Sequence, residues 1–114
     1  MAARYEKRKT MARAKVAFIF LAPDSDPSKH RAIISTPEAL ALTVVGVKDY
    51  DQAAEVAREL VDQGVEAIEL CGGFGNLGLA RVSRAVGKKA AVGAVRFDIH
   101  PLLGCRSGDD LNKA

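Results

Sequence analysis

Four apolar runs divide the chain, and each stops at a turn-forming or charged residue. They occupy residues 15–21, 40–47, 67–71 and 90–97. Continuous apolar runs of this length, without alternation, are typical of strands that lie in a parallel sheet with both faces covered. We therefore predict four main strands.

Two segments between these runs have apolar residues at helical spacing. The first begins with Asp49 as N-cap and Gln52 three residues on, a capping-box pattern, and Gly64 closes it. The second follows a glycine turn, where Asn76 is the expected cap, and Gly87 ends it. The apolar faces are formed by Ala53, Val56, Ala57, Leu60 and Val61 in the first helix and by Leu79, Val82, Ala85 and Val86 in the second.

Residues 23–39 show no clear element of their own. Asp26 followed by Pro27 is an N-cap with proline at the first helical position, which predicts a helical turn. Residues 32–36 have an extended pattern that Pro37 ends, so we expect a short edge strand there. A segment of this length is long enough to cover a site.

The order is strand, loop, strand, helix, strand, helix, strand. It predicts an α/β fold with a small, mainly parallel sheet, either open or half-barrel-like, and two main helices. Strands joined by a helix lie parallel and cross over right-handedly. Ligands of such sheets bind beyond the carboxyl ends of the strands. Residues 23–24, 48–49, 71–73 and 98–100 are therefore expected to gather on one rim.

Two helices are too few to cover both faces of a sheet whose strands are apolar on both sides. A sheet this small also has two exposed edges. We therefore expect a homodimer or a higher symmetric oligomer, in which a second copy covers the face or edge that the first leaves open.

A chain of 114 residues, 48% apolar and 27% charged, is typical of one globular domain. Its net charge of +3 is concentrated at one end: residues 1–15 hold six basic and one acidic residue, which leaves eleven basic and thirteen acidic residues in 16–114. We divide the chain into a basic extension (1–14), one α/β domain (15–103) and a polar tail (104–114) that frays. A basic extension can bind polyanions, but a solvated or added segment explains it more simply, so nucleic acid is not an expected partner.

No apolar run approaches the roughly 18–20 residues of a membrane span, and no signal-peptide pattern follows the basic start. We expect a cytoplasmic protein without a membrane partner. Cys71 and Cys105 are expected to be free thiols rather than a disulfide. No nucleotide-binding fingerprint is present, and no cofactor is predicted.

The strongest candidate site lies at residues 68–75, where an apolar strand runs into three glycines and a helical pattern follows at once. A helix that begins beside glycines presents backbone N–H groups and the positive end of its dipole to an anion. We expect the turn to bind a carboxylate or a phosphate through Gly72, Gly73, Phe74 and Gly75.

Cys71 stands at the mouth of this turn. A thiol beside a helix N-terminus and cations can be a nucleophilic thiolate, although a cysteine often only fills core space. Glu69 shares a strand face with Cys71, and a carboxylate in an apolar strand needs a partner. Glu69 is therefore either a general base or half of a buried salt bridge.

Three polar residues follow the last strand. Arg96, Asp98 and His100 alternate, so that in a strand their side chains share one side. Asp98 and His100 can form a proton-transfer pair, and Arg96 can hold a carboxylate or phosphate with two hydrogen bonds. The alternative is a structural ion pair between Arg96 and Asp98, with His100 as an ordinary loop residue.

The loop after the first strand carries Lys29, His30 and Arg31, which would bring positive charge to the rim if the loop folds over it. Otherwise they are ordinary surface residues. No metal site is predicted, because no two of the possible ligands have a recognised spacing; these are Cys71, His30, His100 and Asp98.

Several of these segments together resemble an uncharacterised family of small bacterial α/β proteins. The resemblance covers about residues 15–101 and rests on Phe18–Pro23, Asp26–Pro27 with Lys29–Arg31, Thr43–Val47, the ELCGGFG motif within Ile68–Gly75, and the VRFD-x-HP motif of Val95–Pro101. The family is a domain of unknown function, so the resemblance implies no activity and no catalytic residue. A looser similarity to a TIM-barrel fragment, where a strand ending in glycines binds phosphate, is an analogy of fold alone.

Two hypotheses for the function follow. In the first, a small isomerase, lyase or hydrolase binds an anionic metabolite on the glycine turn, with Arg96 as a second anchor. Cys71 would be its nucleophile or acid–base group, and His100 with Asp98 its proton-transfer pair. In the second, a non-catalytic module binds a ligand through the same turn or serves as a subunit of a larger assembly, and the thiol only packs.

Overall fold

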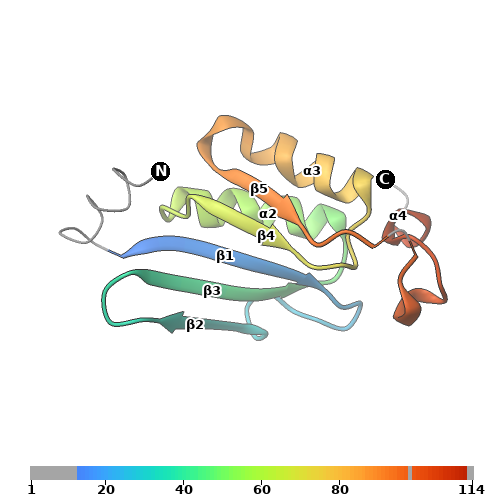
Figure 1. Cartoon of the computed structure of the whole chain (residues 1–114), viewed down its shortest axis with the longest axis horizontal. Coiled ribbons are helices and arrows are strands. Elements are labelled where there is room, and N and C mark those ends of the chain that lie inside the picture. The colour runs from blue at the N-terminus through green and yellow to red at the C-terminus, as the bar shows by residue number, and fades with distance from the viewer. Residues whose placement is uncertain (1–12, 98, 113–114) are drawn as a thin grey trace.

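The structure, a computed structural model, describes residues 13–97 and 99–112. One five-stranded sheet runs through it in the order β2-β3-β1-β4-β5 (Figure 1). All neighbouring strands are parallel except β2, which lies antiparallel to β3 at one edge. The predicted α/β fold with a mainly parallel sheet is confirmed. The strands are β1 (Ala14–Leu21), β2 (Arg31–Ser35), β3 (Leu40–Val47), β4 (Ala67–Leu70) and β5 (Ala91–Ala94).

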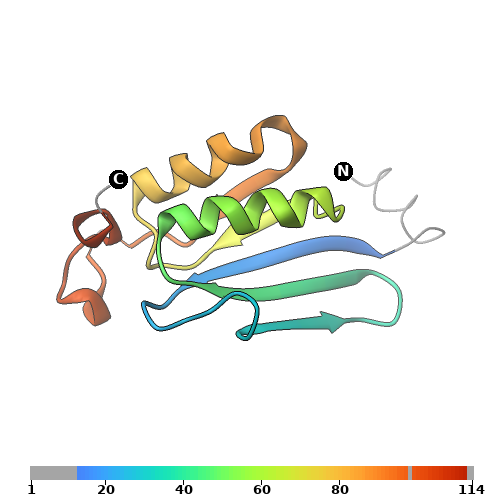
Figure 2. The same cartoon turned by 180° about the vertical axis from the view of Figure 1, so that it is seen from behind.

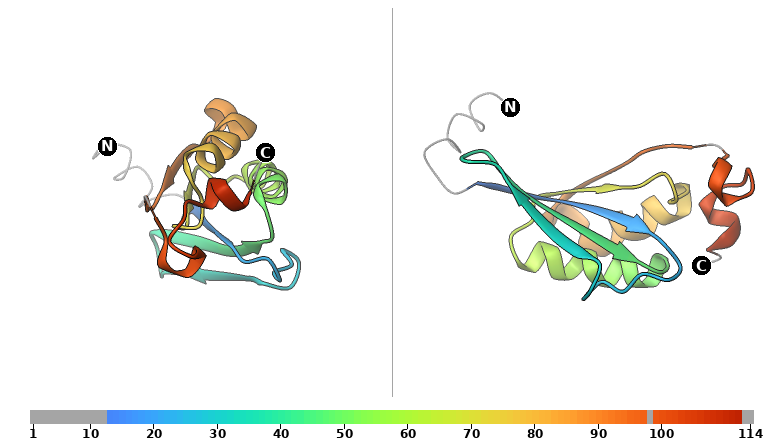
Figure 3. Two further views of the ribbon diagram at one scale, coloured as in Figure 1. Left: turned by 90° about the vertical axis from the view of Figure 1, so that its right-hand side faces the viewer. Right: turned by 90° about the horizontal axis from the view of Figure 1, so that it is seen from below.

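Two main helices connect the parallel strands, and both lie on the same face of the sheet (Figures 2 and 3). Helix α2 (Tyr50–Asp62) joins β3 to β4, and α3 (Asn76–Val86) joins β4 to β5. No helix in the described part of the chain is long and apolar enough to cross a membrane. The shorter helices are η1 (Gly87–Lys89), η2 (Pro101–Leu103) and α4 (Gly108–Leu111).

The start of α2 confirms the predicted cap. The Asp49 carboxylate accepts the N–H of Gln52 at 2.8 Å, and the Gln52 side chain accepts the N–H of Lys48 at 2.8 Å. These bonds satisfy donors that the first turn of a helix leaves unpaired. The sequence therefore specifies this boundary locally.

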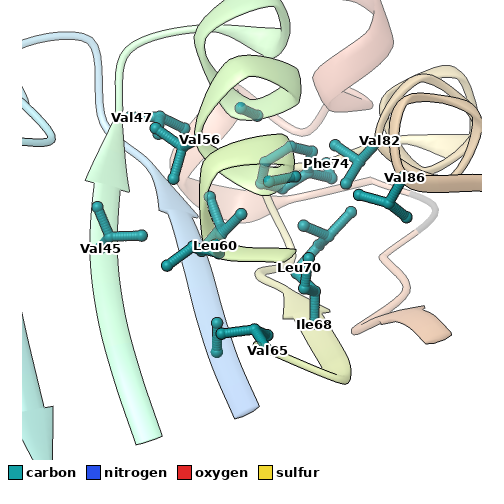
Figure 4. Close-up of a cluster of buried hydrophobic side chains, with 14 of the residues drawn as sticks. Val45, Val47, Val56, Leu60, Val65, Ile68, Leu70, Phe74, Val82 and Val86 are labelled. Atoms are coloured by element: carbon teal, nitrogen blue, oxygen red, sulfur yellow. The ribbon is translucent and has the colours of Figure 1, made fainter. Parts of the chain in front are cut away.

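The core lies between the two helices and the sheet (Figure 4). Alternate residues of each strand point toward the helices, as the period of two requires. Ile19 and Val45 are fully buried, and Leu60 of α2 and Val82 of α3 meet them from the helix layer. This one-sided burial holds the helices on the sheet.

The opposite face of the sheet carries no helix among the described residues, and we call it the open face. Its side chains are apolar and half-buried on the two central strands, and Ile34 on the edge strand is 60% exposed. The expected burial of the strands on both faces therefore holds, in the single chain, for one face only. The main apolar residues of the open face are Val16, Phe18, Phe20, Leu42, Val44 and Ile34.

Residues 23–39 extend the sheet rather than covering it. The Asp26 backbone carbonyl accepts the N–H groups of Lys29 and His30, which forms the predicted helical turn. The chain then pairs as β2 beside β3, which is the short edge strand expected there. The open face gains a strand from this segment, and Ser25 packs beside the Phe20 ring near Gly46 at one end of that face.

Alanine substitutions should destabilise the fold at buried helix positions much more than at exposed ones. Leu60→Ala removes a side chain that is 1% exposed, and we expect the free energy of unfolding to fall by about 2–5 kcal/mol. Leu77→Ala, at a helix position that is 58% exposed, should change it by about 0.5 kcal/mol or less. Urea unfolding followed by circular dichroism measures both, and equal effects would contradict the assigned core.

Candidate functional site

The candidate site lies on the rim where the carboxyl ends of the parallel strands meet. The glycine turn follows β4 directly and leads into α3. The C-terminal helix α4 returns to this rim and lies at the amino end of α3 (Figure 3). The turn is therefore not open to solvent in the way the sequence predicts.

The amino end of α3 already holds an anion, the carboxylate of Asp109 from α4. This carboxylate accepts the N–H of Leu77 at 3.0 Å and the N–H of Gly78 at 3.3 Å. The backbone N–H of Asn76 also helps to lower the pKa of this carboxylate. A helix start thus holds a carboxylate, but not through the residues predicted for an external anion. The Gly73 N–H donates to the Cys71 sulfur, the Phe74 N–H donates to the Cys71 carbonyl, and the Gly75 N–H donates to the Tyr50 hydroxyl.

Tyr50, the first residue of α2, completes this arrangement. Its hydroxyl donates to Asp109 at 2.8 Å and accepts the N–H of Gly75 at 3.0 Å. Its ring stacks on Phe74 with centroids 5.5 Å apart. Burial and the adjacent Asp109 carboxylate raise the pKa of Tyr50 well above its usual range, so the hydroxyl remains a donor.

Partial burial works to raise the pKa of Asp109, but hydrogen bonds from the Leu77 N–H, the Tyr50 hydroxyl and the Gly78 N–H outweigh it. The net pKa of Asp109 is therefore lowered from its ordinary value. The carboxylate is held in its charged form, which is the form that the helix end favours.

Two glycines make this close approach possible. A side chain at Gly75 would collide with the Asp109 carboxylate, and one at Gly108 would collide with the backbone carbonyl oxygen of Gly73. Glycine at both positions lets the backbone of α4 lie directly on the turn. The three-glycine pattern of the sequence thus serves an internal contact.

The sequence-based prediction differs from the structure at two points here. Asn76 does not cap α3. Gly75 occupies the N-cap position and has no side chain to form a cap bond, and Asp109 supplies the cap by accepting the N–H of Leu77, 32 residues before it. The segment after Gly104, expected to fray, forms α4 instead. The signal for α4 was Ser107 with an acid three residues on, a capping-box pattern, and the Ser107 hydroxyl does accept the N–H of Asp109.

Cys71 is half-buried and packs against the core. Its sulfur accepts the N–H of Leu21 at 3.3 Å and that of Gly73 at 3.4 Å. No hydrogen bond joins it to His100 within the described residues. The position suits a packed thiol that closes the strand end.

His100 lies on the other side of the turn. Its imidazole is tilted against Phe97 with ring centroids 4.5 Å apart, and both rings approach Gly72. The His100 Nδ1 accepts the N–H of Leu102 at 3.1 Å, so in the neutral ring the proton is on Nε2. Gly72 faces His100, whereas the preceding Cys71 faces the core.

The last strand ends earlier than predicted, at Ala94. The strand alternation expected to align Arg96 with His100 therefore does not reach them. Arg96 is exposed, and Asp98 lies outside the described residues. The proposed proton-transfer pair of His100 and Asp98 remains a prediction.

The loop residues lie on the far side of the rim. Arg31 begins the edge strand β2, three strands away from β4, which is about 14 Å at about 4.8 Å between strands. It forms an ion pair with Glu59 at 3.7 Å. The His30 Nδ1 accepts the N–H of Asp26 at 2.8 Å, and Lys29 is exposed in the same turn. These three residues do not join the glycine turn.

Glu69 is exposed on the open face and has no ion pair among the described residues. The burial that the predicted buried salt bridge requires is therefore absent in the single chain, and the role of Glu69 as a general base stays a prediction. Across residues 13–97 and 99–112, no three histidine, cysteine, aspartate or glutamate side chains come together as a metal site.

A groove of about 560 Å³ lies elsewhere, between the outer sides of α2 and α3. Charges of both signs line it, and Arg81 and Asp51 form an ion pair across it. Sequence analysis did not single out this groove. Its mixed charge favours no one class of ligand.

The chain belongs to a protein family of unknown function, DUF6506, which matches residues 14–110. The family match confirms the resemblance drawn from the motifs. It includes Asp109, so the C-terminal contact lies within the family's extent. No curated protein and no solved structure matches the chain.

Removing the Asp109 charge should weaken the fold, whereas the neighbouring acid serves as a control. We expect Asp109→Asn to lower the free energy of unfolding at pH 7 by about 1–3 kcal/mol, because charged hydrogen bonds to α3 and Tyr50 are lost. Asp110→Asn, at an exposed position, should change it by about 0.5 kcal/mol or less.

The difference in the free energy of unfolding between wild type and Asp109→Asn should also depend on pH. Because the pKa of Asp109 is lower in the folded state, its contribution is complete above the ordinary value of 3.8 and is lost as the pH falls through the folded pKa. The difference between wild type and Asp109→Asn should therefore shrink below pH 3.8. Urea unfolding across pH measures it, and a constant difference would show that the charge does not matter.

The two thiols should react at different rates in the folded protein. Cys105 is exposed and Cys71 is half-buried. We expect a Cys71→Ser variant to react with a thiol reagent at neutral pH several times faster than a Cys105→Ser variant, since access limits the remaining thiol of the latter. Faster reaction of the Cys71 thiol would instead support its predicted role as a nucleophile.

Proposed function

We propose that this protein binds a small carboxylate-bearing metabolite at the amino end of α3, and that Asp109 occupies the site when no ligand is bound. The observation that supports the proposal is the convergence of the Leu77 N–H, the Gly78 N–H and the Tyr50 hydroxyl on one carboxylate. Donors arranged for one planar carboxylate suit another of the same shape. The ligand class follows from the anion that the donors already hold.

Displacement of Asp109 is feasible because α4 has only four residues. A helix of this length has little stability of its own and depends on its contacts. An incoming ligand competes with an intramolecular group, whose effective concentration is on the order of millimolar or more. The wild-type protein should therefore bind a free carboxylate more weakly than a chain that lacks the Asp109 carboxylate.

The experiment uses Asp109→Ala, with Asp110→Ala as the matched control. Sodium acetate is titrated at constant ionic strength, and the amide signals of Leu77 and Gly78 are followed by NMR. We expect saturable shifts in Asp109→Ala at lower acetate concentration than in wild type, and wild-type behaviour in Asp110→Ala. The melting temperature of Asp109→Ala should also rise with acetate, because a ligand that binds only the folded state stabilises it.

Absence of saturable binding by Asp109→Ala overturns the proposal. Binding by this variant, combined with a wild-type protein that responds to no carboxylate, favours a second function. In that function the chain is a non-catalytic structural or assembly subunit, and Asp109 is a permanent cap. The close backbone contact of Gly108 with Gly73 favours it, because a tightly packed contact is costly to open.

The isomerase, lyase or hydrolase activity expected from the sequence stays a prediction, as do the roles of Cys71, Glu69 and His100 in it. Anchoring of the ligand by Arg96 is likewise part of the prediction. We infer a cytoplasmic setting, which the two free thiols support because structural thiols persist in reducing compartments.

A further inference from the structure

We propose that the open face of the sheet is the interface between two copies of this chain. This inference is independent of the ligand proposed for α3, because it rests on the other face of the sheet. The two copies pack face to face, sheet against sheet, and the helices of each copy lie on the outside.

The apolar side chains of the open face form one continuous surface. Phe18 pairs with Val44 across β1 and β3, and Val16 pairs with Leu42 in the same register. Paired residues on neighbouring strands lie side by side. Ile34, opposite Leu42, extends the surface onto β2.

Charge is almost absent from this surface. Within the described strands, Glu69 on β4 is the one charged residue that alternation places on the open face. It lies opposite Phe18 across β1 and β4, so this one charge borders the Phe18–Val44 centre on the side toward β5. The apolar part of the surface therefore lies over β2, β3 and β1, and Glu69 bounds it on β4.

The surface is large enough for a specific dimer. The five strands cover about 450 Å² in projection, at about 3.3 Å per residue and about 4.8 Å between strands. Accessible area exceeds projected area because side chains stand out from the sheet. Two copies therefore reach the total of about 1,000 Å² that a specific interface requires.

The parts of the printed sequence outside the described residues do not suit this surface. They are residues 1–12, 98 and 113–114. The first of these segments carries four basic residues and one acid among its twelve, and the last has two residues. Burial of that much charge on an apolar face is unfavourable.

A second copy fits better than a different protein because the surface is self-complementary. It is apolar over β2, β3 and β1, and the single charge of Glu69 is too little to select a partner of opposite sign. Two sheets pack face to face at about 10 Å, with their side chains interdigitating. A two-fold axis that lies between the two sheets, in the plane of the contact, would place the same surface on both sides of it.

The test compares two adjacent isoleucines of β2. Ile34 lies on the open face and is 60% exposed, whereas Ile33 points to the opposite face and is 65% exposed. Both tolerate lysine in the monomer because both are solvent-exposed. Val44→Lys adds a charge at the centre of the surface. Multi-angle light scattering of the full chain at tens of micromolar gives the mass, and circular dichroism reports folding.

We expect wild type and Ile33→Lys to be dimers of twice 12.1 kDa. At the same concentration, Ile34→Lys and Val44→Lys should be folded monomers. A wild-type monomer at these concentrations overturns the proposal. So does a dimer that Ile34→Lys and Val44→Lys leave intact, or one that Ile33→Lys disrupts equally. A full chain that is monomeric but dimerises after deletion of residues 1–12 also overturns it, because the extension would then occupy the face.

Discussion

The right-handed crossover is the constraint on which this structure depends. The chain steps from β3 over β1 to β4 and then to β5, always in the same direction across the sheet. With a fixed crossover handedness, steps in one direction place their helices on one face. A sheet covered on both faces needs a reversal of direction, and the remaining connection, from β1 to β3, contains the edge strand β2 instead of a helix. The open face is thus a result of topology.

The same parallel arrangement brings three distant segments to one rim. Tyr50 follows β3, the glycine turn follows β4, and α4 comes from the end of the domain. The Asp109 carboxylate and the Tyr50 hydroxyl accept three N–H groups that would otherwise be unsatisfied at the start of α3, and the hydroxyl donates to the carboxylate. The contact ties elements that no backbone hydrogen bond of the sheet connects, so the loss of one group affects all three.

Local signals were sufficient for much of the fold. The strands follow from apolar runs, and the start of α2 follows from Asp49 and Gln52, which interact within four residues. The cap of α3 was not predictable in this way, because its carboxylate comes from Asp109 and the neighbouring Asn76 offered a plausible local substitute. The helix start after the glycine turn holds the carboxylate of Asp109 through Leu77 and Gly78, and binding of an external anion by the glycines stays a prediction. Periodicity also overextended the last strand beyond Ala94, since apolar residues continue after pairing stops.

The two proposed surfaces are physically separate, although they share β4. Asp109 and Tyr50 lie on the side of the sheet that carries the helices, whereas Phe18 and Val44 face the other way. Strand β4 contributes Leu70 to the core and Glu69 to the open face, and Tyr50 follows β3, which contributes Val44 to the open face. Displacement of Asp109 by a ligand would move α4, which packs against α3, and would leave the pairing of β1 with β3 and β4 unchanged. Assembly through the open face and occupancy of the α3 site are therefore expected to be independent properties of the same fold.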